Sequence, residues 1–538
     1  MKRHSNLGIL LALAALALGC SGGSPAAPDI QRDIQTFDYD AIEIFGPSTA
    51  GEEITGNLFH DICLCQIRCV VPGLGSAQEI FPEHGCAAVT LVRRDDTTNY
   101  PFKPVFRWLD WNEQEGIGAG EDPLYVTARE TDNCNNTADY RAPACAAIYD
   151  AGYGIVDPLG HQPAVELVVC YQVRNVEGLF NNADWDIGVT ALQWIGEDAV
   201  NHFWEQEPAC RYDIVVDDPQ GDAQHDEFNP DIAYDHRDGA VYAVYSNVED
   251  NASLQRIKYR KYYRVPNNYS AEFYAQTTDH NGHDPSIDTG YIDFTNPQST
   301  EYMVAVAYTS QYKIPGPGPG TAPHYGFHVC ATSWPSSAAP RSWPTAYDLM
   351  NWDYAYLDAG LPSLDISPNV LEPEYDNVAA LVYTQVTGSD GYGPITWTFI
   401  VRFMGTLSAH VRVNENEELN EYDDALYPSV AINSQTGDPV FASVTHLAQT
   451  HQTDTLRPWA ARMQINVDPP VPAWRDWVDQ NALILGNYNI SDIPFVDPGV
   501  ASAIVTNAGN NYWAAWCNRT EMEPPPTAVY ATRGVAGG

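Results

Sequence analysis

Basic residues are scarce in this 538-residue chain: 27 Lys and Arg stand against 70 Asp and Glu, a formal net charge of -43. Only five are lysines, namely Lys2, Lys103, Lys258, Lys261 and Lys313. Nucleic-acid binding needs clustered Lys and Arg to neutralise phosphates, so this composition argues against a nucleic-acid partner and against charge-driven docking on an anionic bilayer. The acid excess is typical of a surface kept soluble in saline surroundings.

Long apolar runs are also lacking. The run from Leu7 to Leu18 has twelve residues, too short to cross a bilayer as a helix, and it follows the basic pair Lys2 and Arg3. This arrangement predicts an export signal. The run ends Leu16-Ala17-Leu18-Gly19-Cys20, which resembles the lipobox of bacterial lipoproteins. The resemblance implies cleavage before Cys20, lipidation of that cysteine, and a lipid-anchored protein of the outer membrane or cell surface. The alternative is a plain secretory signal.

Eight cysteines lie close together in the first part of the chain: Cys63, Cys65, Cys69, Cys86, Cys134, Cys145, Cys170 and Cys210. An even, dense set in an exported region predicts about four disulfides, whose connectivity cannot be read from sequence. The rival interpretation is a zinc site at Cys63, Cys65, Cys69 and Cys86, but these spacings are not the usual paired ones. No Cys-x-x-Cys-His motif occurs, which argues against a c-type haem.

Short strand-like runs fill the region before residue 211, with Gly-, Pro- and Asn-rich turns between them and no long amphipathic helical pattern. Examples are 87–92, 165–173 and 187–194. We therefore expect an all-β fold whose residues 38–210 form a disulfide-rich, β-sandwich-like domain. Residues 1–20 are assigned to the lipoprotein signal and lipidation site, and 21–37 to a flexible tether.

A proline-based pattern repeats from residue 211 onward. A proline is followed two places later by an aliphatic residue and then by Ala or Asp, beginning at Pro230, Pro285, Pro362, Pro428 and Pro498. An apolar strand follows each: 240–245, 303–308, 378–383, 439–444 and 511–516. A third strand and a more polar fourth strand complete each unit. Four strands per unit with an apolar inner pair resembles β-propeller repeats, so 211–538 is predicted to form a five-bladed propeller. A large β-sandwich is the alternative.

Closure of the ring is predicted to use the two ends of this region. The last unit ends after its third strand, and residues 212–216 lie just before the first proline. We expect that segment to supply the missing fourth strand, which leaves no open edge. Cys330 and Cys517 fall in units that are not neighbours in a ring of five, so they are expected to be buried free thiols.

Acidic residues precede the repeat prolines. Asp226, Asp284, Asp424 and Asp497 each lie within four residues before one, and are predicted to converge at one mouth of the ring and bind a ligand. Convergent carboxylates repel unless a cation, a proton or hydroxyl groups satisfy them. Ca²⁺, a glycan or a protein partner therefore remain open, as does the interpretation that an acidic protein simply has acidic loops.

Catalytic signatures are missing: no Ser-His-Asp order, phosphate loop or zinc-protease helix is recognisable. Five-bladed propellers resemble the scaffold of several glycosidase families, which use two carboxylates. That resemblance makes Asp231, Asp288 and Asp365 the catalytic candidates. The metal ligands, if any, are unknown.

Two further clusters have ordinary explanations beside functional ones. His280 and His283 can hold a transition metal or belong to a solvated turn, and His324 and His328 share one face of a strand. The run 256–264 carries five basic residues, which suit either an acidic partner or acidic neighbours in the fold. The leading interpretation is a lipid-anchored envelope or surface binding protein; the alternatives are a glycan hydrolase and a structural component of an envelope assembly.

Overall fold

The computed structural model is built from β-strands alone in the part that it describes. Described are the strands given below together with residues 46, 102, 123, 126, 185, 226, 237–239, 270–272, 275–276, 302 and 336. The predicted signal, Cys20 and the tether lie outside these residues. Among the residues that the structure describes, no helix is long and apolar enough to cross a membrane.

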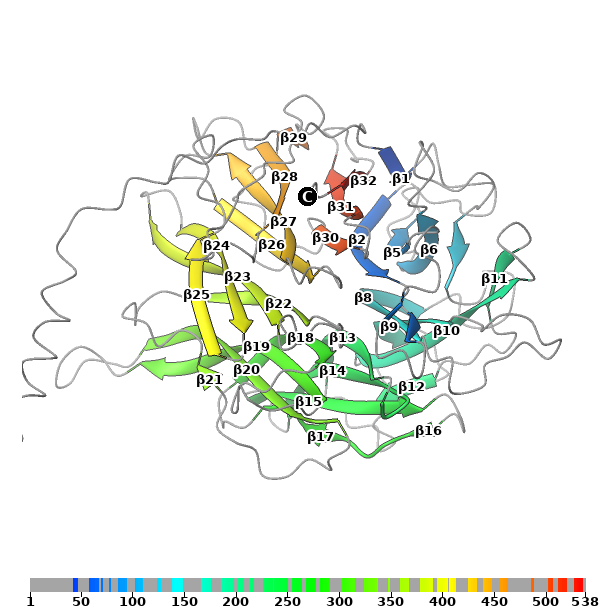
Figure 1. Ribbon diagram of the computed structural model, residues 1–538, viewed down its shortest axis with the longest axis horizontal. Coiled ribbons are helices and arrows are strands. Elements are labelled where there is room, and N and C mark those ends of the chain that lie inside the picture. The colour runs from blue at the N-terminus through cyan, green and yellow to red at the C-terminus, as the bar shows by residue number, and fades with distance from the viewer. Residues whose placement is uncertain are drawn as a thin grey trace, which may run out of the picture.

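The sheets are arranged in a circle around a common centre (Figure 1). We call each unit of four or five strands a blade and number the blades along the chain. Blade 1 contains β2 (Leu58–Gln66), β5 (Cys86–Arg93), β6 (Lys103–Leu109) and β7 (Leu124–Tyr125). Blade 2 contains β8 (Ala138–Ile148), β9 (Glu166–Asn175) and β10 (Asp186–Gly196), with β11 (His202–Gln206) and β12 (Asp213–Val216) both paired to β10. A small separate hairpin joins β3 (Cys69–Val70) to β4 (Ala77–Gln78).

The repeat region supplies the other blades. Blade 3 contains β13 (Glu227–Asp235), β14 (Ala240–Glu249), β15 (Leu254–Tyr263), β16 (Asn268–Tyr269) and β17 (Phe273–Tyr274). Blade 4 contains β18 (Asn281–Gly290), β19 (Met303–Ile314), β20 (His324–Pro335) and β21 (Tyr347–Asp348). Blade 5 contains β22 (Ala359–Ile366), β23 (Val378–Ser389), β24 (Pro394–Met404) and β25 (Thr406–Arg412). Blade 6 contains β26 (Asp424–Ile432), β27 (Pro439–Leu447), β28 (Thr455–Arg462) and β29 (Leu485–Asn487).

Blade 7 joins the two ends of the chain. It contains β30 (Ser502–Thr506), β31 (Asn511–Arg519) and β32 (Thr527–Val535), and β1 (Ile42–Phe45) pairs antiparallel with β32 as its outer strand. The inner strands β2, β8, β13, β18, β22, β26 and β30 contact one another in that order, and β30 contacts β2 again. The ring is therefore closed, and its blades form a propeller-like all-β fold.

Two sequence-based predictions need correction. The expected ring of five has seven blades, because the strands predicted to form a sandwich make blades 1 and 2 of the same ring. Residues 213–216 do not close it: β12 pairs with β10 inside blade 2, while β1 supplies the closing strand. The predicted domain boundary after residue 210 falls between β11 and β12, which both belong to the sheet of blade 2.

The five predicted apolar second strands are confirmed as parts of β14, β19, β23, β27 and β31. Their side chains fill layers between neighbouring blades, since residues of one strand alternate between its two faces. Separate clusters lie between blades 7 and 1, 1 and 2, 2 and 3, 3 and 4, and 4 and 5. Large side chains in these layers are fully buried, among them Tyr171, Tyr242, Tyr245, Tyr308, Tyr383 and Trp513. Burying apolar surface in each layer, at about 25 cal/mol per Å², holds each blade against the next.

Among the cysteines whose side chains the structure describes, none of the predicted disulfides is formed and all are free thiols. Seven are described: Cys63, Cys65, Cys86, Cys145, Cys170, Cys330 and Cys517. The side chains of Cys69, Cys134 and Cys210 lie outside the described residues. The blades are instead stabilised by the apolar layers between them. The expectation for Cys330 and Cys517 is confirmed, because both are free and buried.

Candidate functional site

The inner strands of blades 1 to 6 carry a β-bulge at the same point. Their register shifts within the segments His60–Cys63, Arg141–Ala144, Phe228–Asp231, His283–Ser286, Gly360–Ser363 and Leu426–Ser429. Five bulges contain a proline: Pro143, Pro230, Pro285, Pro362 and Pro428. Proline has no N–H to donate and is tolerated in a sheet at such a point. The repeat prolines therefore mark the bulges of the inner strands.

The residue at each bulge has an unusual backbone conformation. Its φ is positive in five blades: Asp61 (66°), Ala142 (45°), Asn229 (48°), Asp284 (50°) and Leu361 (52°). We call these five residues the bulge ring. Positive φ is uncommon outside glycine, and strained backbone of this kind concentrates at functional sites. A bulge also re-aims a side chain, and the side chains of the bulge ring keep partial access to solvent.

The bulge ring includes a continuous polar chain between blades 3 and 4. The amide of Asn229 donates from Nδ2 to Oδ1 of Asp284 at 2.7 Å. The other carboxylate oxygen of Asp284, Oδ2, lies 3.0 Å from Nδ1 of His283. The His283 ring packs edge-on against Phe327, with 5.3 Å between ring centroids. An amide, a carboxylate, an imidazole and an aromatic ring thus lie together on two adjacent blades, as in sites that recognise polar ligands with apolar faces.

Asp61 brings a protonatable group to the bulge ring. Its Oδ1 accepts the N–H of Ile62 at 2.9 Å, and its backbone carbonyl accepts the hydroxyl of Thr90 at 2.6 Å. Burial raises the pKa of Asp61 from 3.8 to about 7, partly offset by the Ile62 N–H. The group therefore exchanges a proton near neutral pH, which is the range that acid–base catalysis uses.

The three carboxylates proposed for catalysis are engaged in holding the blades together. Asp231 Oδ2 accepts the N–H of Ile287 on the next blade at 2.9 Å, and its Oδ1 accepts its neighbour Ile232. Burial raises the pKa of Asp231 to about 6, while the N–H groups of Ile287 and Ile232 lower it.

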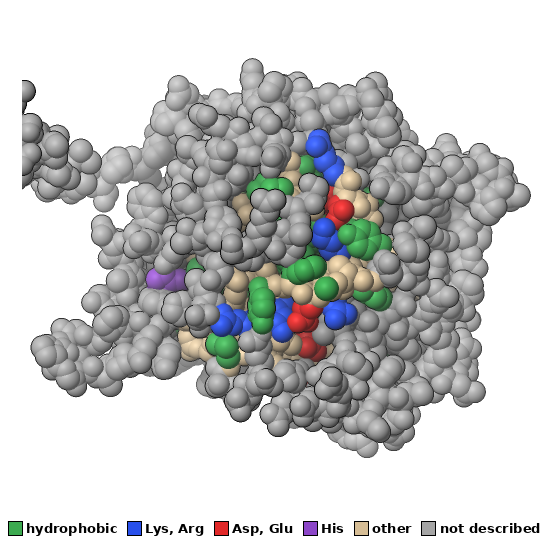
Figure 2. Space-filling model, turned by 90° about the horizontal axis from the view of Figure 1, so that it is seen from below, with side chains coloured by type: hydrophobic (Ala, Val, Ile, Leu, Met, Phe, Trp, Pro, Cys, Tyr) green, Lys and Arg blue, Asp and Glu red, His purple; other side chains and the backbone are tan. Residues whose placement is uncertain are grey.

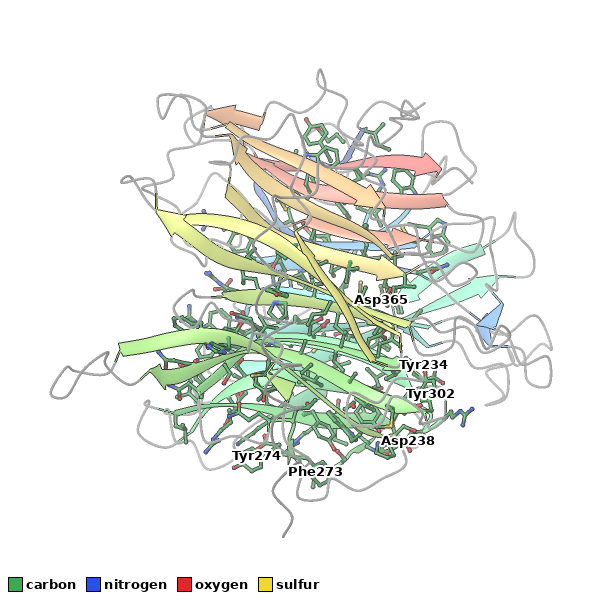
Figure 3. All side chains as sticks on the ribbon, turned by 60° about the vertical axis from the view of Figure 1, so that its left-hand side comes forward. Tyr234, Asp238, Phe273, Tyr274, Tyr302 and Asp365 are labelled. Carbon is green, nitrogen blue, oxygen red and sulfur yellow. The ribbon has the colours of Figure 1, made fainter. Side chains whose placement is uncertain are left out.

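Asp288 and Asp365 make equivalent contacts farther along their strands. Asp288 Oδ2 accepts the N–H of Ile366 on blade 5 at 2.6 Å, and Asp365 Oδ2 accepts the N–H of Ile432 on blade 6. Asp365 lies well inside the molecule, away from Phe273 and Tyr274 at the outer edge (Figure 3). Because these oxygens already bond to neighbouring backbones, the geometry gives these residues a structural role between blades.

Three of the four acids predicted to bind a ligand are placed by the structure, and these three do not occupy equivalent positions. Asp284 sits at the bulge of β18, whereas Asp226 lies just before β13 and its Oδ1 accepts the N–H of Trp185 at 2.9 Å. Asp424 is the first residue of β26 and pairs with His446, and its side chain is outside the described part; Asp497 lies outside altogether. Sequence reasoning missed Asp61 and Asn229. Asn229 could have been found from its place directly before the repeat proline Pro230. Asp61 has no such signal, because Ile62 follows it where the other described bulges have proline.

The histidine candidates are only partly described. His280 and the side chain of His324 lie outside the described residues, while His283 joins the polar chain and His328 is partly buried. Among the side chains that the structure places, no three His, Cys, Asp or Glu residues are grouped as metal ligands.

Residues 256–263 of the basic run lie in the third strand of blade 3, β15, with acidic neighbours, and Arg264 lies outside the described residues. Lys258 Nζ lies 2.8 Å from Glu272 Oε1 and above the ring of Tyr274. Figure 2 shows Lys, Arg, acidic and hydrophobic side chains gathered on one face of the molecule. The expectation that this strand faces acidic groups is confirmed for Lys258.

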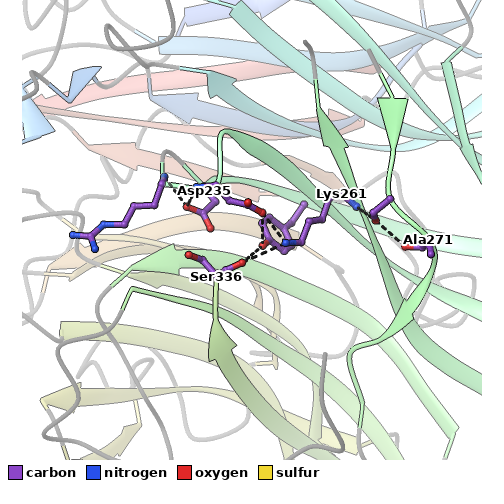
Figure 4. Close-up of polar contacts among 8 residues, drawn as sticks. Asp235, Lys261, Ala271 and Ser336 are labelled. Atoms are coloured by element: carbon purple, nitrogen blue, oxygen red, sulfur yellow. Dashed lines mark hydrogen bonds and ion pairs between the residues drawn. The ribbon is translucent and has the colours of Figure 1, made fainter. Parts of the chain in front are cut away.

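Lys261 of the same strand belongs to a polar network between blades 3 and 4 (Figure 4). Its Nζ lies 2.6 Å from Asp238 Oδ2 and 3.3 Å from the carbonyl of Ser336. The hydroxyl oxygen of Tyr242 lies 3.1 Å from Asp238 Oδ2 and 2.8 Å from the Ser336 carbonyl oxygen, and its single proton can be donated to either acceptor. Asp235 caps the N–H groups of Arg237 and Asp238 in the same hairpin. The network fixes the hairpin between β13 and β14 against blade 4.

Comparison with known proteins adds little to this geometry. No protein-family model matches the chain, and no curated protein matches it. Among solved structures, it is similar to an α-L-arabinanase of Penicillium chrysogenum (10% identity, 70% of this chain and 91% of that chain, TM-score 0.38). It is also similar to the NanB sialidase of Streptococcus pneumoniae (9% identity, 91% and 70%, TM-score 0.38). A protein of unknown function from Dyadobacter fermentans matches at 8% identity (74% and 95%, TM-score 0.39). These values carry no argument about function.

Proposed function

We propose that this protein is a lipid-anchored envelope protein that binds a carbohydrate at the bulge ring. The observation that carries the proposal is the polar chain of Asn229, Asp284 and His283, supplied by two neighbouring inner strands. Amide and carboxylate groups exchange hydrogen bonds with sugar hydroxyls, and an aromatic ring such as that of Phe327 offers an apolar surface beside them. Binding is favoured over catalysis because Asp231, Asp288 and Asp365 are used between blades.

The experiment is a binding titration of the purified full-length chain against a panel of soluble oligosaccharides. Asn229→Ala removes the amide that donates to Asp284, and we expect at least about tenfold weaker binding, the equivalent of one hydrogen bond to a charged group. Tyr274→Ala is the matched control, because Tyr274 is exposed at the outer edge of blade 3. Equal affinity in wild type and Asn229→Ala, or binding lost equally in both variants, would remove the bulge ring as the site.

A second candidate function, glycoside hydrolysis, is favoured by Asp61. A carboxyl group with a pKa of about 7 is protonated enough near neutral pH to act as a general acid. Asp284 would be the second carboxylate; it lies on blade 4, three blades along the ring from blade 1. Release of reducing sugar should then decline above pH 7 as Asp61 ionises, and Asp61→Asn should lack activity. Carbohydrate binding without any product release leaves binding as the function.

The lipid anchor is the other part of the proposal, and it rests on the resemblance of residues 16–20 to a lipobox. Cys20→Ser should move the protein from the membrane fraction to the soluble fraction, because a run of twelve apolar residues is too short to span the bilayer. Retention of the Cys20→Ser variant in membranes after signal cleavage would contradict lipidation at this cysteine.

A further inference from the structure

In blades 3, 4 and 5, one position of the inner strand connects the blade to the next one. The side chain two residues after the bulge residue accepts a backbone N–H from the following blade. Asp231 accepts from Ile287 at 2.9 Å, Ser286 from Leu364 at 3.1 Å, and Ser363 from Val430 at 3.3 Å. We call this the latch position. It joins blades 3 to 4, 4 to 5 and 5 to 6.

Blade 1 carries a cysteine at the latch position. In β2, Cys63 follows the bulge as Asp231 does in β13: each resumes the ladder with the second strand, at Val89 and Val244. In the next blade, Cys145 pairs with Val169 one place after the ladder resumes, which is the position of Ile287 in blade 4. The latch between blades 1 and 2 therefore places two cysteines where the others place an oxygen acceptor and a backbone N–H.

The two thiols are in contact. The Sγ atoms of Cys63 and Cys145 lie 3.4 Å apart, across 82 positions of the chain. A disulfide needs about 2.0 Å between its sulfurs, so small side-chain adjustments would bring them together. Their neighbours Ala144 and Ala147 and the apolar layer between blades 1 and 2 are buried.

We propose that Cys63 and Cys145 form a disulfide that covalently links the inner strands of blades 1 and 2. The link would replace, between blades 1 and 2, the hydrogen bond that the latch position makes from blade 3 to 4, 4 to 5 and 5 to 6. It is independent of the ligand at the bulge ring.

The reaction is a thiol–disulfide exchange with a small disulfide oxidant such as glutathione disulfide. One thiolate attacks the oxidant, forms a mixed disulfide and releases one thiol; the second thiolate attacks the mixed disulfide and releases the other thiol. The two cysteines lose two electrons and two protons, and the oxidant becomes two thiols. Burial raises the pKa of Cys63, and hydrogen bonding with Cys63 and burial raise that of Cys145. Since the thiolate is the reactive form, the bond should form during folding and only slowly in the folded protein.

The chain is well suited to mapping this bond. Trypsin cleaves after Arg32, Arg68, Arg141 and Arg174, which releases peptides 33–68 and 142–174. Each contains one second cysteine, Cys65 and Cys170. The full-length Cys65→Ser/Cys170→Ala variant leaves Cys63 and Cys145 as the sole cysteines of their peptides. It is refolded in a glutathione redox buffer or in dithiothreitol, alkylated with iodoacetamide and digested for mass spectrometry.

We expect the two peptides to be joined, two hydrogens lighter than their sum, after oxidative refolding and to be separate after refolding in dithiothreitol. In the wild type, the unfolding midpoint should be about 4 °C higher when oxidised, as expected for a loop of this length in a chain of this size. Cys63→Ser should remove that difference while still folding, because serine is the residue at this position in blades 4 and 5. Cys330→Ala, in blade 4, is the control that keeps it. Iodoacetamide on both Cys63 and Cys145 after oxidative refolding, or a wild-type link from Cys145 to Cys65, would overturn the assignment.

Discussion

Replacing Asp61 by asparagine tests the electrostatics of the bulge ring directly. Asn keeps an oxygen for the Ile62 N–H and tolerates positive φ, as Asn229 does at the same place in blade 3. The folded protein holds the Asp61 pKa near 7, against 3.8 for the ordinary group. Because the folded pKa is raised, the folded state binds the proton more tightly, and stability falls as pH rises between about 4 and 7.

The size of the effect follows from the same shift. A difference of about 3 units at about 1.4 kcal/mol per unit is at most about 4 kcal/mol above pH 7. With an unfolding entropy of about 2 cal/mol/K per residue over 538 residues, this corresponds to about 4 °C. Asp61→Asn should therefore unfold at nearly the wild-type temperature at pH 4 and up to about 4 °C higher at pH 8.

The assay is differential scanning fluorimetry of both proteins at matched ionic strength from pH 4 to pH 8.5. The quantity that decides is the difference in midpoint between variant and wild type at each pH. A difference that stays constant over this range would show that Asp61 does not change its protonation with folding, and the argument from burial would fail.

Three other outcomes follow from the contacts. Asp288→Ala leaves the Ile366 N–H without its acceptor and should lower the free energy of unfolding by about 2 kcal/mol, which corresponds to an unfolding midpoint about 2 °C lower. A midpoint equal to that of the wild type would show that Asp288 has no structural role. Deleting residues 42–45 removes the closing strand and two fully buried side chains, Ile44 and Phe45, so it should lower the unfolding midpoint by several degrees. Deleting residues 213–216 should lower the midpoint less, and the reverse order would favour closure by β12. Glu272→Gln should lower the free energy of unfolding by less than about 1 kcal/mol, while Glu272→Ala should lower it more because the buried Tyr245 hydroxyl loses its acceptor. Denaturant unfolding measures both values, and in a Tyr245→Phe background the two variants should be equally stable.

Much of the repeat region was predictable because its information is local. The apolar run after each repeat proline predicted β14, β19, β23, β27 and β31, since alternating burial along a strand depends on neighbouring residues. The same pattern failed in blades 1 and 2. There Ile62 replaces the proline, and Cys145 stands where the pattern expected an aliphatic residue.

Blade number and closure were decided by the tertiary structure. β1 and β12 are both short, and the sequence of either one is suitable for an outer strand of a blade. Which of them pairs with β32 depends on which segment the folded chain places beside β32. The role of each carboxylate was decided in the same way. In sequence, Asp231, Asp288 and Asp365 cannot be told apart from Asp61 and Asp284. In the fold, each of the first three accepts a backbone N–H from the next blade, a contact that exists only once the blades are packed. The sequence by itself determined the strands and their spacing, while contacts between residues far apart along the chain determined the ring, the latch positions and the pKa of Asp61.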